Sequence, residues 1–109
     1  MKRGDIVWCV MSSDFGKVRP AVVVQSDLFN GLRETTVLCP LTTTDAAAPL
    51  FRIALSPDAD NQLEKPSWVM VDKVCAVKNT RIREVQGKVS TENMTQIDAA
   101  LLLWLGLGN

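Results

Sequence analysis

Residues 18–25 have the sequence Val-Arg-Pro-Ala-Val-Val-Val-Gln, in which an arginine–proline pair opens an apolar run. β-Branched residues favour extended backbone, and proline restricts both its own φ and the conformation of Arg19 before it. A polar turn at 12–17 separates this run from an earlier apolar run at 6–11. The pattern predicts two neighbouring strands, with the Arg19 guanidinium at the start of the second.

Short runs rich in valine and isoleucine continue along the chain, with turn-forming Gly, Pro, Asn and Asp between them. Such runs predict strands. The expected strands cover residues 6–11, 21–25, 36–39, 51–55, 68–71, 74–77 and 85–89. Strands and helices do not alternate regularly, which argues against a parallel doubly wound sheet. We therefore expect a mainly β, α+β fold with a curved antiparallel sheet or small barrel.

Two segments predict helix. Ser90 or Thr91 can cap a C-terminal helix, because a hydroxyl at this position accepts a bond from an unpaired backbone N–H. The apolar residues that follow with helical spacing are Met94, Ile97, Leu101, Trp104 and Leu105. A second, short helix is expected to begin near residues 26–27, with Leu28 and Phe29 facing inward.

The end of the predicted C-terminal helix carries more apolar side chains than one packing face needs. Residues 101–105 are Leu-Leu-Leu-Trp-Leu, followed by Gly106 as a plausible stop. A helix lying on a sheet buries one stripe, and large exposed apolar patches are rare on monomers. The surplus indicates a subunit interface, with simple core packing as the alternative.

Length and composition limit the possible functions. The chain has 109 residues, which suits a single domain spanning 1–109, and 47% of them are hydrophobic. Twelve basic residues balance twelve acidic ones, so any nucleic-acid site must be a local patch. Histidine is absent, which removes the usual near-neutral base and the commonest metal ligand. We expect no metal site and no cofactor.

Cysteine usage and hydropathy indicate a cytoplasmic protein. Cys9, Cys39 and Cys75 are far apart in apolar runs, a pattern typical of reduced packing residues rather than of a disulfide framework. The basic start is followed by Gly4 and Asp5 where a secretion signal would be apolar. The longest apolar run, at 99–107, is too short to span a bilayer, so no membrane association is expected.

Arg19 and the threonines at 42–44 are the first candidates for chemistry. A guanidinium is always charged and binds oxyanions through two parallel bonds, so Arg19 could clamp a phosphate. The alternative is a surface charge, or a pair with Asp14. Thr42, Thr43 and Thr44 follow a buried run, where threonines usually satisfy a turn but can also direct hydroxyls at phosphate oxygens.

Asp72 and the basic stretch around it are the next candidates. Asp72 interrupts an apolar run at 68–74. It is either a solvent-facing partner of Lys73 or another basic residue or, if close to Arg19, a positioning group or general base. The basic residues of this region are Lys73, Lys78, Arg81, Arg83 and Lys88. They form either an ordinary solvated face or a groove for single-stranded nucleic acid, in which bases would stack on Phe15, Phe29 or Trp68.

Several of these segments, in this order and spacing, resemble the MazF/PemK (Kid) toxins of bacterial toxin–antitoxin systems. The matching segments are 3–8, 19–24, 40–43, 67–72, 87–90 and the leucine-rich tail. The resemblance implies a small SH3-like antiparallel barrel with a C-terminal helix, assembled as a homodimer. It also implies metal-independent cleavage of single-stranded RNA at a short sequence, and a cognate antitoxin whose disordered tail covers the RNA groove.

The resemblance also assigns roles to individual residues. By position, Arg19 and Thr42 match the catalytic arginine and threonine of the family. The implied substrate-binding residues are Asp14, Phe15, Lys17, Thr43, Met70 and Asp72. Many relatives carry Gly-x-Glu-Gln in a longer first loop, and here only Asp14 could replace that glutamate. Some relatives place an arginine two residues before the aspartate, where this chain has Met70.

These residues suit cleavage by the RNA's own 2′-hydroxyl, which yields a 2′,3′-cyclic phosphate and a 5′-hydroxyl end. Arg19 would stabilise the extra negative charge and Thr42 would supply a hydroxyl bond. The base would be Asp72, Asp14 or solvent. Two other functions remain open. One is a gyrase-poisoning toxin like the CcdB proteins, and the other is a catalytically silent barrel that binds RNA or a peptide.

Overall fold

The computed structural model describes residues 1–11 and 17–108. The described chain forms seven strands, one α-helix and two single-turn 3₁₀ helices. The strands are β1 (Asp5–Val10), β2 (Val18–Val23), β3 (Thr35–Thr42), β4 (Arg52–Leu55), β5 (Ser67–Met70), β6 (Cys75–Lys78) and β7 (Ile82–Lys88). The helices are η2 (Val71–Lys73), η3 (Asn79–Arg81) and α1 (Thr91–Trp104).

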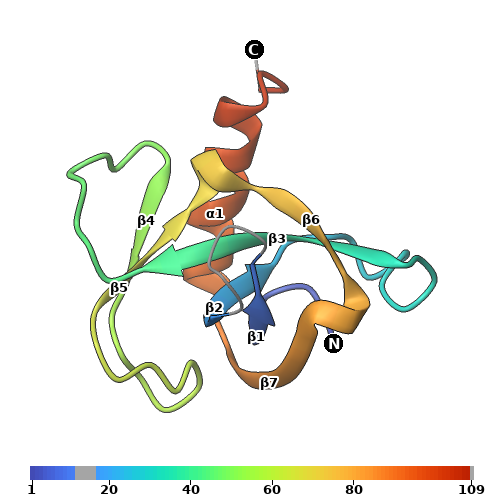
Figure 1. Cartoon of the computed structure of the whole chain (residues 1–109). Helices are drawn as coiled ribbons and strands as arrows, with labels where there is room; N and C mark the ends of the chain where they lie inside the picture. The colour runs from blue at the N-terminus through green and yellow to red at the C-terminus, as the bar shows by residue number, and fades with distance from the viewer. Residues whose placement is uncertain (12–16, 109) are drawn as a thin grey trace.

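All strand pairs are antiparallel, and together they make one curved sheet (Figure 1). The strand order is β4-β5-β3-β2-β1-β7, and β6 adds to β3. The expected mainly β fold with a C-terminal helix is confirmed. The barrel is an open one in the described residues, because the pairing path ends at β4 on one side and at β7 on the other.

Alternation along the central strands divides the core into two clusters. Ile6, Val22 and Cys39 belong to the cluster that includes Ile97 and Ala100 of α1. Their sequence neighbours Val7, Ala21, Val23 and Leu38 belong to a second, smaller cluster. This second core cluster also contains Cys9 and Val77. Because successive strand residues point to opposite faces, the second cluster lies on the face of the sheet away from α1. A groove opens on that same face of the sheet.

The expected short helix near residues 26–27 is wrong. The segment forms hydrogen-bonded turns, and Leu28 and Phe29 are 77% and 54% exposed rather than facing inward. The Asp27 carboxylate accepts bonds from the Arg3 backbone N–H (2.7 Å) and from the Asn30 side chain (2.8 Å). Such side-chain bonds compete with helical backbone pairing, and one of these partners comes from a distant part of the chain.

The predicted start and end of the C-terminal helix are confirmed. The Ser90 hydroxyl accepts a bond from the Asn93 backbone N–H at 3.0 Å, which makes Ser90 the N-cap. Gly106, with φ of 72°, adopts the left-handed conformation that follows many helix ends. The apolar residues exposed at this end are Leu102, Leu103, Trp104, Leu105 and Leu107. Within 1–11 and 17–108, no helix is long and apolar enough to cross a membrane.

Candidate functional site

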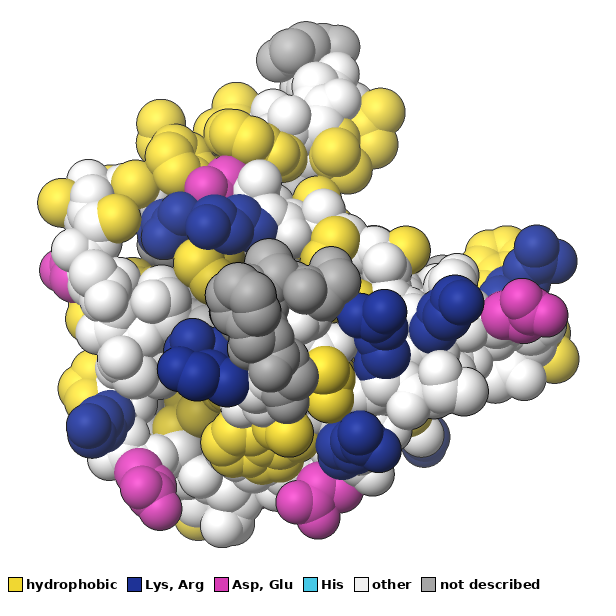
Figure 2. Space-filling view, in the orientation of Figure 1, with side chains coloured by type: hydrophobic (Ala, Val, Ile, Leu, Met, Phe, Trp, Pro, Cys, Tyr) yellow, Lys and Arg dark blue, Asp and Glu magenta, His cyan; other side chains and the backbone are white. Residues whose placement is uncertain are grey.

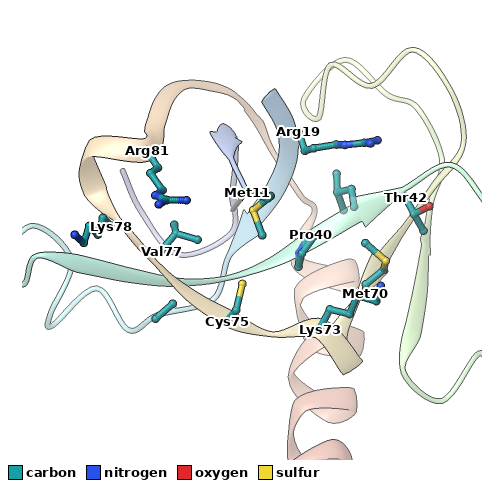
Figure 3. A pocket seen from close by; sticks show the side chains of 12 residues that line it. Met11, Arg19, Pro40, Thr42, Met70, Lys73, Cys75, Val77, Lys78 and Arg81 are labelled. Atoms are coloured by element: carbon teal, nitrogen blue, oxygen red, sulfur yellow. The ribbon is translucent and has the colours of Figure 1, made fainter. Parts of the chain in front are cut away.

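A groove of about 540 Å³ opens beside the second core cluster (Figure 3). The described residues that line it are Met11, Arg19, Pro40, Leu41, Thr42, Met70, Lys73, Cys75, Ala76, Val77, Lys78 and Arg81. They come from β2, β3, β5, β6 and the two 3₁₀ turns, together with Met11 after β1. The groove therefore exists only in the assembled sheet.

Strand register brings Arg19 and Thr42 together. β2 pairs with β3 through Ala21 with Pro40 and, further along, Val23 with Leu38. Arg19 lies two residues before Ala21 and Thr42 two residues after Pro40, so both follow the last β2–β3 pair at the same end of the ladder. Both side chains line the groove, and Figure 3 shows them at the same end of it. The sequence predicted these two residues as a pair, and the structure puts them within one cavity.

Two prolines lie beside the groove, where the pairing partners of β3 change. On the other edge of β3, β6 pairs as far as Leu38 and β5 pairs from Leu41 onward. Pro40 lies in the gap between them, and proline has no N–H to donate to a ladder. Pro20 similarly lies one residue beyond the last β2–β3 pair, between Ala21 and Arg19. The β2–β3 pairing thus ends beside these two prolines, and Pro40 itself lines the groove.

The Thr42 hydroxyl already has one partner. It accepts a hydrogen bond from the Thr44 backbone N–H at 3.1 Å, which is the local turn interaction considered from the sequence. A hydroxyl has two acceptor sites and one donor hydrogen. The turn uses an acceptor site and holds the oxygen in place, so the O–H can still donate to a phosphate oxygen. The structural and the chemical interpretations of Thr42 are therefore compatible.

The groove is locally basic in a chain of zero net charge. Arg19, Lys73, Lys78 and Arg81 line it, and no Asp or Glu is among its described lining residues. Figure 2 shows Lys and Arg side chains gathered across this face. The predicted basic stretch is thus divided, because Arg83 and Lys88 lie on β7 and do not line the groove.

Asp72 has a partner that the sequence did not suggest. Its carboxylate accepts two bonds from Arg52, Nε to Oδ1 at 2.7 Å and Nη2 to Oδ2 at 2.9 Å, and both side chains are largely buried. The hydrogen bonds from Arg52 lower the pKa of Asp72. A carboxylate with a lowered pKa is a weaker proton acceptor, so the structure favours a positioning role for Asp72 over general base. Asp72 belongs to η2, and its ion pair with Arg52 holds this turn in place. The turn follows Met70 and ends at Lys73, and both of these residues line the groove.

The remaining predicted site residues do not all lie in the groove. Met70 lines the groove, whereas Lys17 and Thr43 are exposed and do not. Asp14 and Phe15 lie outside the described residues. Of the other predicted stacking aromatics, Phe29 is on an exposed turn and Trp68 lines a separate cavity beside α1.

Cys75 and Met11 are groove residues that sequence reasoning did not select. Cys75 is half-buried, and burial raises the pKa of its thiol. Burial raises the pKa of Cys39 further, to about 12. Both thiols therefore stay protonated at neutral pH and act as packing groups. No sequence signal identified Cys75 or Met11, and Cys75 reaches the groove only because β6 pairs with β3. In the described chain, no cluster of three or more Cys, Asp or Glu side chains is arranged to hold a metal ion.

Fold and groove define a small α+β protein with a cationic cleft on an open antiparallel sheet. Residues 2–105 match the family described as the PemK-like, MazF-like toxin of type II toxin–antitoxin systems, and the chain belongs to that family. The resemblance inferred from the sequence is thereby confirmed.

Individual relatives agree with the family match. The chain is 36% identical over 108 residues to a probable endoribonuclease MazF of Mycolicibacterium smegmatis, covering 98% of each chain. A mycobacterial endoribonuclease solved with its cognate antitoxin superposes with a TM-score of 0.83 at 25% identity, over 98% of this chain and 96% of that one. MazF of Deinococcus radiodurans shares the fold with a TM-score of 0.81, at 22% identity over 97% and 96% of the two chains.

Proposed function

We propose that this MazF-like toxin is an endoribonuclease that cleaves single-stranded RNA at a short sequence in the groove, without a metal ion. The observation that carries the proposal is that Arg19 and Thr42 line one cleft, whose described lining residues include no carboxylate. Support also comes from the relatives, which are named as endoribonucleases.

In the proposed mechanism the RNA supplies its own nucleophile. The 2′-oxygen forms a bond to the adjacent phosphorus, and the bond from phosphorus to the 5′-oxygen breaks. The 2′-hydroxyl loses its proton to a base, and the departing 5′-oxygen takes one from solvent. Arg19 and Thr42 stabilise the charge that develops on the phosphoryl oxygens, where one well-placed donor contributes about 3–4 kcal/mol. With Asp72 held by Arg52, we assign the base to Asp14 or solvent.

Digestion of a long, mixed-sequence RNA by the purified chain in EDTA tests this proposal. We expect discrete fragments that end in 2′,3′-cyclic phosphate and begin with 5′-hydroxyl, identified by mass spectrometry. Intact RNA would contradict the proposal. Gyrase inhibition in that case would indicate a CcdB-like toxin, and binding without cleavage a silent RNA-binding barrel.

We further propose that the exposed apolar end of α1 forms a homodimer interface. Five large apolar residues at 102–105 and 107 are exposed there, and burying them would remove apolar surface from water. Sedimentation should give a dimer of about twice the 12.0 kDa chain mass, and Leu105→Glu should give a monomer. Leu32→Glu, at a 75% exposed position on another surface, is the control and should stay dimeric. A dimeric Leu105→Glu protein would exclude this interface.

The proposed partner is a cognate antitoxin whose disordered tail covers the groove. A basic cleft attracts an acidic or extended polar segment as well as RNA. The proposal is supported by the mycobacterial relative, which was solved with its cognate antitoxin. Adding the antitoxin to the EDTA digest should leave the RNA intact. We assign the activity to residues 1–109 acting as one domain in the cytoplasm.

A further inference from the structure

The turn η2 depends on outside contacts for its orientation. It is a single 3₁₀ turn without a side-chain cap, and a hydrogen bond from the Val74 backbone N–H to the Val71 carbonyl at 3.1 Å closes it. Such short turns have few internal bonds, so their neighbours largely determine how they lie. Lys73, the last residue of η2, is exposed and lines the groove (Figure 3). The position of the Lys73 ammonium therefore depends on what holds η2.

Two successive residues, at the point where β4 begins, hold η2. The Phe51 carbonyl accepts a bond from the Val71 backbone N–H at 3.0 Å. Arg52 donates to both carboxylate oxygens of Asp72, which fixes the plane of the carboxylate as well as its distance. The Phe51 ring also packs against Trp104 of α1, with ring centroids 5.2 Å apart. The support of η2 thus comes from β4 and, through Phe51, from α1.

Arg52 supports the groove without entering it. Its side chain lines the separate cavity beside α1, together with Trp68 and Leu103, and it is not among the described lining residues of the groove. The side chains of Arg52 and Asp72 are only 15% and 16% exposed. Burying two charges removes their hydration, so a well-packed apolar pair can give comparable stability. What the ion pair supplies in addition is a defined orientation of η2.

We infer that Arg52 is a positioning residue for RNA binding, because its ion pair with Asp72 orients η2 and thereby holds the Lys73 ammonium in the groove. This inference rests on the proposed function and adds to it a residue that does not touch the RNA. Arg52 acts on the substrate only through Asp72 and Lys73. Loss of the ion pair should therefore affect RNA binding in the same way as loss of the Lys73 charge.

The decisive variant is Arg52→Met/Asp72→Leu, which replaces the ion pair by apolar side chains and leaves the net charge unchanged. Its matched control is Arg3→Met/Asp98→Leu. Arg3 and Asp98 form another Arg–Asp pair, between the N-terminal segment and α1, and neither of them lines the groove. Neither variant leaves a charge without its partner, so thermal unfolding should show that both are folded.

The binding probe is a random-sequence pool of single-stranded 2′-fluoro RNA, which has no attacking hydroxyl. At about 0.1 M salt we expect Arg52→Met/Asp72→Leu to bind roughly 5- to 10-fold more weakly, with a slope of log K against log salt smaller by about 0.7, the value for one lost phosphate contact. The control should bind within about twofold of the parent chain with an unchanged slope, because it loses no phosphate contact. A purely structural role of the pair would change the melting temperature without changing this slope.

Lys73→Gln tests the route by which Arg52 acts. In the parent chain this substitution should reduce the salt slope by about 0.7 as well. In the Arg52→Met/Asp72→Leu background it should cause little further loss, because groups that act through one contact are not additive. With cleavable RNA, the loss in kcat/KM should fall on KM and leave kcat within about threefold of the parent value.

Three outcomes would overturn the positioning role: parent-like binding by Arg52→Met/Asp72→Leu, an equal loss in the control, or a full additional loss from Lys73→Gln. A parent chain that does not bind the RNA pool would overturn the proposed function, and this inference with it. A parent chain that binds RNA without cleaving it would contradict the ribonuclease proposal alone, because the binding measurements need no cleavage.

Discussion

Arg19→Ala should reduce RNA cleavage by roughly a hundred- to a thousandfold or more, because it removes the main charge that stabilises the phosphoryl transition state. Arg19 is exposed near the start of β2 and belongs to neither core cluster, so the variant should remain folded. The measurement is the initial rate of fragment formation in EDTA, compared at equal protein concentration, with thermal unfolding as the check on folding.

A further variant at Arg19 separates the guanidinium from its charge alone, and two others serve as a control and as a test of additivity. Arg19→Lys should rescue little, because an ammonium cannot donate two parallel bonds to a phosphate. Arg33→Ala removes an exposed arginine outside the groove and should cleave like the parent chain. Thr42→Ala combined with Arg19→Ala should lose less than the product of the two single losses, since groups that act on one transition state are not additive. Unchanged cleavage by Arg19→Ala would remove this residue from the mechanism.

Replacing the ribose at the cut by deoxyribose should abolish cleavage at that bond. In the proposed route the 2′-hydroxyl is the nucleophile, and its removal leaves no attacking group, whatever the protein contributes. The effect should exceed that of any single side-chain substitution. Gel or mass analysis of an oligonucleotide that carries one deoxynucleotide at the cleavage position gives the answer directly.

The matched substrate carries its single deoxynucleotide one position away from the cut and should be cleaved normally. The modified substrate should also compete with RNA for binding, because its phosphates are intact. Cleavage of the same bond without the 2′-hydroxyl would require a different nucleophile, such as water, and would exclude the cyclic-phosphate product.

Local sequence predicted the regular elements well. Each of the seven expected strands overlaps an observed one, although β2 and β7 each begin three residues earlier than expected and β2 ends two residues earlier. Runs of β-branched residues separated by turn formers carry this information, because backbone preference depends on near neighbours. The Ser90 cap followed from the same kind of short-range signal, a hydroxyl just before an apolar periodic segment.

Predictions from the sequence were wrong or incomplete where contacts with distant residues compete with local backbone preference. The helix predicted near residues 26–29 does not form. The Asp27 carboxylate instead accepts a hydrogen bond from the Arg3 backbone N–H, 24 residues away. The sequence left the partner of Asp72 open between Lys73, another base and Arg19, and the structure pairs it with Arg52, 20 residues earlier. Only the β4–β5 register, in which Arg52 faces Met70, brings that guanidinium close to η2.

The chain's own pattern determined which groups were available: a guanidinium before a buried strand, a threonine closing another, and a basic stretch after Asp72. Tertiary structure alone decided that Arg19 and Thr42 line one cleft, that Lys78 and Arg81 line it too, and that Arg52 holds Asp72. The physical reason is the range of the interactions. Strand and helix preferences arise between adjacent residues, whereas register, burial and ion pairing arise only when segments far apart in sequence pack together.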